Sequence, residues 1–166
     1  MEAFEKIRDK VQNLEKSKIT VQEWQKENQK VVFTNGCFDL LHMGHIDYLS
    51  KAKDLGTKLI VGVNSSESVS KLKGPSRPIN STESRATMLA AFEFIDLVIV
   101  FNEETPLNLI SNLVPNILVK GGDYSFETIV GAKTVVKYGG EVKVIPFLKG
   151  YSTTNIVTKI QSFSKT

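Results

Sequence analysis

The sequence contains little cysteine and histidine, and it has no long apolar run. Among its 166 residues, Cys37 is the only cysteine, which excludes an internal disulfide and suits a reducing compartment. No stretch approaches the ~18–20 apolar residues that a membrane-spanning helix needs. The charged start MEAFEKIRDK also lacks the apolar core of a signal peptide. We therefore expect a cytoplasmic protein that does not bind a membrane.

The sequence also lacks a strong charge of either sign. Its formal net charge is +3, with charged residues making up 23% of the chain and spread evenly along it. This distribution argues against nucleic acid as a partner, because nucleic-acid-binding proteins concentrate basic residues on one face. It remains compatible with a local site for a small anionic ligand.

Strand and helix patterns alternate five times from Lys30 onward. The apolar runs KVVFTN, TKLIVGVN, DLVIVF, NILVKG and EVKVIPF are typical of buried parallel strands. Helical patterns such as GHIDYLSKAKDLG and TESRATMLAAFEFI separate these runs. The pattern predicts an α/β fold with a doubly wound, five-stranded parallel sheet of the Rossmann-like kind. The polar stretch 64–81 is expected to be a long loop opened by a helical turn.

The first thirty residues have a different pattern. One apolar face predicts a helix over 1–16, and the spacing of Thr20 and Glu23 predicts the start of a second, short helix. Such a segment is too short to bury a core alone. We therefore divide the chain into an N-terminal helical extension at 1–29 and an α/β domain at 30–166.

Both histidines lie in TNGCFDLLHMGHI, between the first long strand and a helix. Gly36 allows the backbone to approach a ligand, while His42 and His45 are placed around the start of the helix, where an anion is favoured. A neighbouring polyphosphate stabilises a protonated imidazole. The stretch therefore predicts a site that binds phosphate oxygens and stabilises charge that develops on a reacting phosphoryl group.

Two other interpretations of the histidine pair are weaker. A zinc site would need further ligands, and with no third histidine these would have to be Cys37 and Asp39. A purely structural role would leave Gly44, between the histidines, without a packing purpose that the sequence reveals. We expect no metal held by protein side chains alone.

Two motifs resemble a known family. GCFDLLHMGH resembles the (T/H)-x-G-H signature of the nucleotidyltransferases, which include the cytidylyltransferases, and STTNI at 152–156 resembles their second signature. The pairing of both motifs is more specific than either alone. The resemblance implies that 30–166 is a nucleotidyltransferase domain, in which His42 and His45 bind the phosphates of the nucleotide and stabilise the pentacoordinate phosphorus.

Four further stretches narrow this resemblance. VNSSESVSKLKGPSRPIN, FNEETPLNLI, LVKGGDY and GYSTTNI together resemble the adenylyltransferases that act on D-glycero-β-D-manno-heptose 1-phosphate, over roughly residues 18–160. The resemblance implies transfer of AMP from ATP, with Mg²⁺, to the sugar 1-phosphate for lipopolysaccharide inner-core biosynthesis. It also implies a stand-alone form without the fused sugar kinase, and a homodimer. A cytidylyltransferase for glycerol 3-phosphate or another small phosphorylated alcohol is the alternative, and a non-catalytic nucleotide-sensing module is a third possibility.

Basic residues outside the histidine motif are candidates for phosphate binding. Lys71, Lys73 and Arg77 form either a lid over the phosphates or a solvated basic loop. Arg85 is expected to contact the outgoing phosphates, as the resemblance implies, since its guanidinium suits bidentate binding. Lys51 is placed with the catalytic residues, although an ion pair with Asp47 is the simpler interpretation.

The nucleotide-binding residues are expected at the carboxyl ends of strands and at helix starts next to them. The two glycines of KGGDY permit close approach of a base or ribose, although a tight turn would also explain them. Ser152 can cap the last helix and form a second anion site. Asp39 either orients its turn or holds Mg²⁺. The full set is Asn35, Gly36, Cys37, Phe38, Asp39, Gly44, Lys73, Gly121, Gly122, Asp123, Ser152, Thr153 and Thr154.

Overall fold

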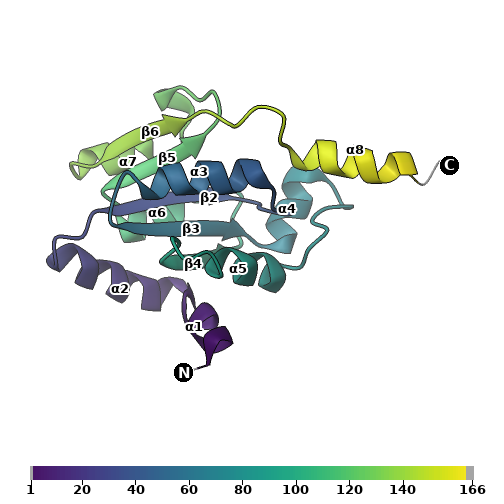
Figure 1. The fold of residues 1–166 in the computed structure, drawn as a ribbon. Coiled ribbons are helices and arrows are strands. Elements are labelled where there is room, and N and C mark those ends of the chain that lie inside the picture. The colour runs from purple at the N-terminus through teal and green to yellow at the C-terminus, as the bar shows by residue number, and fades with distance from the viewer. Residues whose placement is uncertain (1, 164–166) are drawn as a thin grey trace.

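A computed structural model describes residues 2–163 and contains a six-stranded parallel sheet with the order β1-β4-β3-β2-β5-β6 (Figure 1). The strands are β1 (Val11–Gln12), β2 (Val31–Gly36), β3 (Lys58–Asn64), β4 (Leu97–Phe101), β5 (Ile117–Gly121) and β6 (Glu141–Ile145). The chain winds from β2 through β3 to β4, and then returns to β5 on the other side of β2. The switch point of this doubly wound sheet therefore lies between β2 and β5.

Helices cover both faces of the sheet (Figure 1). They are α1 (Ala3–Asp9), α2 (Leu14–Lys26), α3 (Met43–Lys53), α4 (Ser66–Lys73), α5 (Thr82–Ala90), α6 (Leu107–Leu113), α7 (Ala132–Lys137) and α8 (Thr153–Phe163), with a short 3₁₀ helix at Phe126–Thr128. Among residues 2–163, no helix is long and apolar enough to cross a membrane. The α8 helix contributes no buried residue and extends from the body of the fold.

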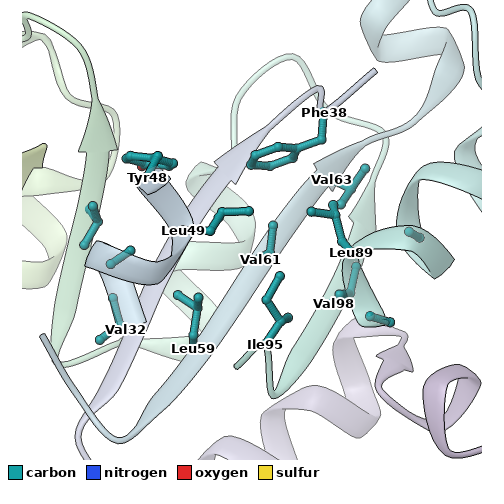
Figure 2. Close-up of a cluster of buried hydrophobic side chains, with 14 of the residues drawn as sticks. Val32, Phe38, Tyr48, Leu49, Leu59, Val61, Val63, Leu89, Ile95 and Val98 are labelled. Atoms are coloured by element: carbon teal, nitrogen blue, oxygen red, sulfur yellow. The ribbon is translucent and has the colours of Figure 1, made fainter. Parts of the chain in front are cut away.

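Two apolar clusters lie on opposite faces of the sheet. Figure 2 shows the first, in which Tyr48 and Leu49 of α3 and Leu89 of α5 pack against alternate strand residues. The second cluster contains buried residues of α2, α6 and α7. Neighbours along a strand point to different clusters, as with Val32 and Phe33, because successive strand side chains alternate between faces. The predicted doubly wound α/β fold is confirmed.

The N-terminal segment differs from the prediction. The sheet has six strands rather than five, because Val11 and Gln12 pair with β4 as an edge strand. The expected helix over 1–16 is wrong, since α1 ends at Asp9 and the Lys10 carbonyl accepts a hydrogen bond from Val98 N–H at 2.8 Å. Two residues are too few for a strand pattern to be recognised in a sequence.

The second helix also begins earlier than expected. Asn13 caps α2 and accepts a hydrogen bond from Lys16 N–H, whereas Thr20 lies inside the helix and donates its hydroxyl to the Lys16 carbonyl. Val21 is buried in the second cluster. The segment thus packs on the sheet, while the division at 29/30 stays a prediction. The stretch 64–81 contains a helix of 8 residues, α4, rather than a single turn.

Candidate active site

A cavity of about 500 Å³ opens at the carboxyl ends of β2, β3 and β5. This is the place where ligands bind in doubly wound sheets. Nine of the residues expected to bind substrates line it, namely Asn35, Gly36, Cys37, Phe38, Asp39, His45, Lys73, Gly121 and Thr153. The structure therefore brings together residues from four separate stretches of the sequence.

The two histidines stack on each other at the start of α3. Their ring centroids are 3.9 Å apart, and the planes are inclined by 22°. His42 occupies the N-cap position, and its backbone N–H points to Nδ1 of His45 at 3.4 Å. With Nδ1 accepting, the neutral His45 ring carries its proton on Nε2, which can donate to a ligand.

Both imidazoles are neutral near pH 7 in the free protein. Burial, together with the nearby His42 and Lys73, lowers the pKa of His45 to about 4. Burial also lowers the pKa of His42. Since an adjacent anion stabilises the protonated form, binding of a polyphosphate would raise these pKa values again.

Gly44 has a packing role that the sequence did not reveal. A Cβ atom at this position would lie 3.0 Å from Nδ1 of His42 and 3.1 Å from Cβ of Tyr151. The glycine thus allows the His42 ring and the segment before α8 to approach each other. His42 lines a smaller hollow of about 140 Å³ together with Tyr151 and Ser152. The two sequence signatures therefore meet in space.

Arg85 does not line the cavity in this structure, which gives its expected contact with the outgoing phosphates no support and leaves it a prediction. Its side chain is fully buried. Nε donates to the Asn80 carbonyl at 3.1 Å, while Nη1 donates to the carbonyls of Cys37 at 2.8 Å and Asn64 at 2.6 Å. The guanidinium therefore holds together the loops that follow β2 and β3.

Asp39 anchors the loop before α5. Its carboxylate accepts hydrogen bonds from the backbone N–H groups of Ile79 at 2.8 Å and Asn80 at 2.9 Å, and forms an ion pair with Arg77. Burial opposes ionisation, yet these contacts hold the pKa of Asp39 below its usual value. Of its two expected roles, the geometry favours orientation of the loop.

Other expected residues lie outside the cavity. Lys51 is about half exposed and forms an ion pair with Asp47 at 2.8 Å, so the geometry matches the simpler interpretation and gives it no catalytic contact. Asp123 and Thr154 are exposed and do not line the cavity. Ser152 caps α8, because its Oγ accepts a hydrogen bond from Asn155 N–H at 3.1 Å.

An aromatic ring of the chain itself packs on the glycines of KGGDY. A Cβ atom at Gly121 would lie 2.5 Å from Cε1 of Phe147, and one at Gly122 would lie 3.0 Å from Cε2 of the same ring. Gly122 also has a φ of +107°, which favours glycine. These glycines thus accommodate Phe147, and their contact with a nucleobase stays a prediction.

Two tyrosines and a lysine are among the cavity residues that the sequence-based set did not include. Tyr48 and Tyr124 line the cavity, as does Lys120. The position of Lys120, in an otherwise apolar strand just before two glycines, was a signal in the sequence that could have revealed it. The two tyrosines had no such signal, because aromatic residues in these positions usually belong to a core.

The carboxylates that line the cavity are Asp39 and Glu104. The oxygens of Asp39 are already engaged by the loop before α5. Such a site fits a Mg²⁺ ion that arrives on the phosphates of a nucleotide, since Mg²⁺ keeps several waters and needs few protein ligands.

Comparisons with known proteins agree with this geometry. Residues 33–159 match the family model described as cytidylyltransferase-like. The chain is 56% identical over 135 residues to the bifunctional protein HldE of Syntrophotalea carbinolica, covering 81% of the chain and 28% of that protein. It is 50% identical over 151 residues to the HldE protein of Geobacter sulfurreducens, covering 91% of the chain and 31% of that protein. The chain thus spans about a third of the length of these relatives.

Solved structures share the fold. The lipopolysaccharide core biosynthesis protein from Thermoplasma volcanium GSS1 is 29% identical, with a TM-score of 0.58 over 75% of this chain and 99% of that one. Pantoate-β-alanine ligase from Francisella tularensis has the same TM-score at 17% identity, over 88% of this chain and 74% of that one, and shows the fold alone. The stacked histidine pair at the switch point and the family match over residues 33–159 lead to one conclusion: the chain belongs to the cytidylyltransferase-like family.

Proposed function

We propose that the chain transfers AMP from ATP to D-glycero-β-D-manno-heptose 1-phosphate, for lipopolysaccharide inner-core biosynthesis. The observation that carries the proposal is the stacked pair of His42 and His45 at the start of α3, beside the cavity at the switch point. The similarity to the HldE proteins and to a lipopolysaccharide core biosynthesis protein supports this acceptor.

The reaction needs no nucleophile from the protein. An oxygen of the sugar 1-phosphate attacks the α-phosphorus of ATP, the bond to the bridging oxygen breaks, and pyrophosphate leaves with the electron pair. The acceptor phosphate is already anionic near neutral pH, so no strong base is required. Catalysis then consists of positioning and charge stabilisation.

Each part of the site has a role in this reaction. The start of α3 and Nε2 of His45 donate to phosphate oxygens, and the imidazoles gain positive charge as negative charge accumulates there. Mg²⁺, when bound with ATP, neutralises charge on the triphosphate. Lys73, on the cavity wall, approaches the same region. Arg85 and Asp39 hold the loops in position.

A panel of nucleotides and acceptors tests the proposal. Pyrophosphate release is measured with ATP or CTP, each with heptose 1-phosphate or glycerol 3-phosphate. We expect turnover with ATP and heptose 1-phosphate. Turnover with CTP and glycerol 3-phosphate would establish the alternative cytidylyltransferase activity, whereas tight ATP binding without turnover on any acceptor would indicate a nucleotide-sensing module.

Three finer features belong to the same proposal, namely dependence on Mg²⁺, a homodimer and a cytoplasmic location. Removal of divalent cations with EDTA should abolish turnover, and added Mg²⁺ should restore it. Sedimentation velocity should give twice the mass of one chain, and a single-chain mass would remove the dimer from the proposal.

A further inference from the structure

A lysine bridges the two strands between which the winding of the sheet reverses. Lys120 is the penultimate residue of β5, and its Nζ lies 3.2 Å from Oδ1 of Asn35 near the end of β2. Both side chains line the cavity. The contact therefore spans the crevice at the switch point, where a ligand of this fold would be seated.

The ammonium group of Lys120 has no anionic partner within residues 2–163. Its two direct contacts are with neutral groups, namely the Asn35 amide oxygen at 3.2 Å and the ring of Tyr124, whose centroid is 5.7 Å away, while the nearby Cys37 side chain partly opposes the effect of burial on its pKa. By contrast, Lys53 and Lys58 form ion pairs with Asp96 at 2.6 and 3.4 Å. Burial lowers the pKa of Lys120, which shows that its charge is poorly solvated.

The carboxylates of the cavity do not neutralise this lysine. Asp39 is paired with Arg77 and bonded to the backbone of the loop before α5. Glu104 is exposed and forms no ion pair with Lys120. A partly buried cation that the carboxylates of its cleft leave unpaired forms a site that an anionic ligand completes.

We propose that Lys120 is a further substrate-binding residue, whose ammonium group contacts an oxygen of a reacting phosphate in the crevice between β2 and β5. The inference rests on the proposed function, in which two anionic phosphates must approach each other. The phosphate is either the α-phosphate of the nucleotide or the phosphate of the acceptor. Asn35 orients the lysine, since its amide oxygen holds Nζ over the crevice.

The test compares three variants. Lys120→Met removes the charge but keeps the length, Lys120→Arg keeps the charge, and Lys133→Met removes an exposed lysine of α7 as the matched control. Calorimetry gives the Kd of α,β-methylene-ATP with Mg²⁺, and the Kd of heptose 1-phosphate in its presence. Steady-state kinetics with ATP give kcat. Urea unfolding checks that each variant is folded, and Lys120→Gln replaces the Met variant if that one is not.

We expect Lys120→Met to weaken one of the two affinities by about 30-fold, as the loss of a charge-assisted hydrogen bond would. Lys120→Arg should recover most of this loss, and Lys133→Met should stay within about twofold. If the ATP analogue binds more weakly to the variant, the partner of Lys120 is the α-phosphate of the nucleotide. If heptose 1-phosphate binds more weakly, the partner is the phosphate of the acceptor. If Lys120→Met leaves both affinities unchanged but lowers kcat, and Lys120→Arg restores kcat, the contact is made in the transition state.

Two results would overturn the inference. The first is that Lys120→Met keeps both affinities within about twofold of wild type and kcat within about threefold. The other is a loss that Lys120→Arg does not restore at all, which would mean that the lysine acts through packing. The binding measurements require no turnover. If the wild-type protein releases no pyrophosphate, the proposed function is refuted, but the affinities of the variants still test the role of Lys120.

Discussion

At the scale of single residues, His45 links nucleotide binding to protonation. Its pKa is about 4 in the free protein, because burial disfavours the cation. A bound polyphosphate raises this pKa, so the complex holds more protons than the free protein at any pH between the two values. Affinity should therefore increase as the pH falls through that range. Calorimetry of α,β-methylene-ATP at pH 6.5, in two buffers with different ionisation enthalpies, should detect proton uptake.

The variant His45→Gln is the control for this measurement, because it keeps a side-chain donor but cannot titrate. We expect it to show less proton uptake than wild type. Equal uptake in both proteins would place the protonation change on another group.

Arg85 is expected to contribute strongly to stability. Replacement by Met leaves the carbonyls of Asn80, Cys37 and Asn64 without their donor in a buried place. The free energy of unfolding should fall by about 3–5 kcal/mol, as when one partner of a buried charged network is removed. Urea unfolding measures this loss. Arg8→Met, at an exposed position on α1, should change the free energy of unfolding by less than about 0.5 kcal/mol. Equal losses in the two variants would contradict the structural role of Arg85.

At the scale of elements, β1 should stabilise the sheet. Removing residues 1–12 deprives Val98 N–H of the Lys10 carbonyl and uncovers apolar residues beside Ile7 and Val11. We expect a loss of about 2 kcal/mol or more in urea unfolding, given the usual value of a buried aliphatic side chain. Light scattering should show association, because β4 becomes an exposed edge. Phe4→Ala, at an exposed position, is the control, and an unchanged midpoint after truncation would contradict the prediction.

The cap of α8 should have a local effect only. Ser152→Ala removes the acceptor for Asn155 N–H, which usually costs about 0.5–2 kcal/mol of helix stability. Since α8 has no buried residue, the midpoint of global unfolding should not move. Hydrogen exchange of the α8 amides should become faster, whereas Ser162→Ala near the helix end should leave it unchanged. A shift of the global midpoint would show that α8 is coupled to the core.

Some elements could be predicted from the sequence and others could not, for physical reasons. Strands β2 to β5 are apolar runs, because both faces of each of these strands are buried, whereas the edge strand β6 is mostly exposed. The apolar face of residues 1–16 is real, but it combines α1, β1 and the start of α2, which no periodicity separates. The end of α1 at Asp9 depends on a hydrogen bond to β4, which is a contact between distant segments.

At the scale of the whole molecule, nucleotide binding should stabilise the fold through its phosphates. A ligand at about 100 times its Kd adds ~2.7 kcal/mol to the free energy of unfolding, which raises Tm by roughly 5–10 °C in a chain of this size. Differential scanning calorimetry with α,β-methylene-ATP and Mg²⁺ should show this rise. Adenosine at the same concentration, which lacks phosphates, should give a much smaller one. Equal shifts would mean that the histidine pair and the start of α3 contribute little to binding.

The site as a whole could be predicted only in part. The histidine signature and the strand ends pointed to the place where the structure has its cavity, because these motifs are local in the sequence. The buried position of Arg85, the role of Gly44 beside Tyr151 and the placement of Lys120 beside Asn35 all depend on segments that meet only after folding. Family resemblance assigned Arg85 a phosphate contact, whereas its side chain is fully buried in this structure and does not line the cavity.

The packing of Phe147 on Gly121 has a consequence for protein engineering. Gly121 ends β5 and Phe147 follows β6, and a methyl group at residue 121 cannot be added unless the ring of Phe147 moves or is replaced by a smaller side chain. A library that varies one position at a time would discard Gly121→Ala as harmful. A library that varies the pair, with Phe147→Val or Phe147→Ala, could recover it and reshape this wall of the cavity.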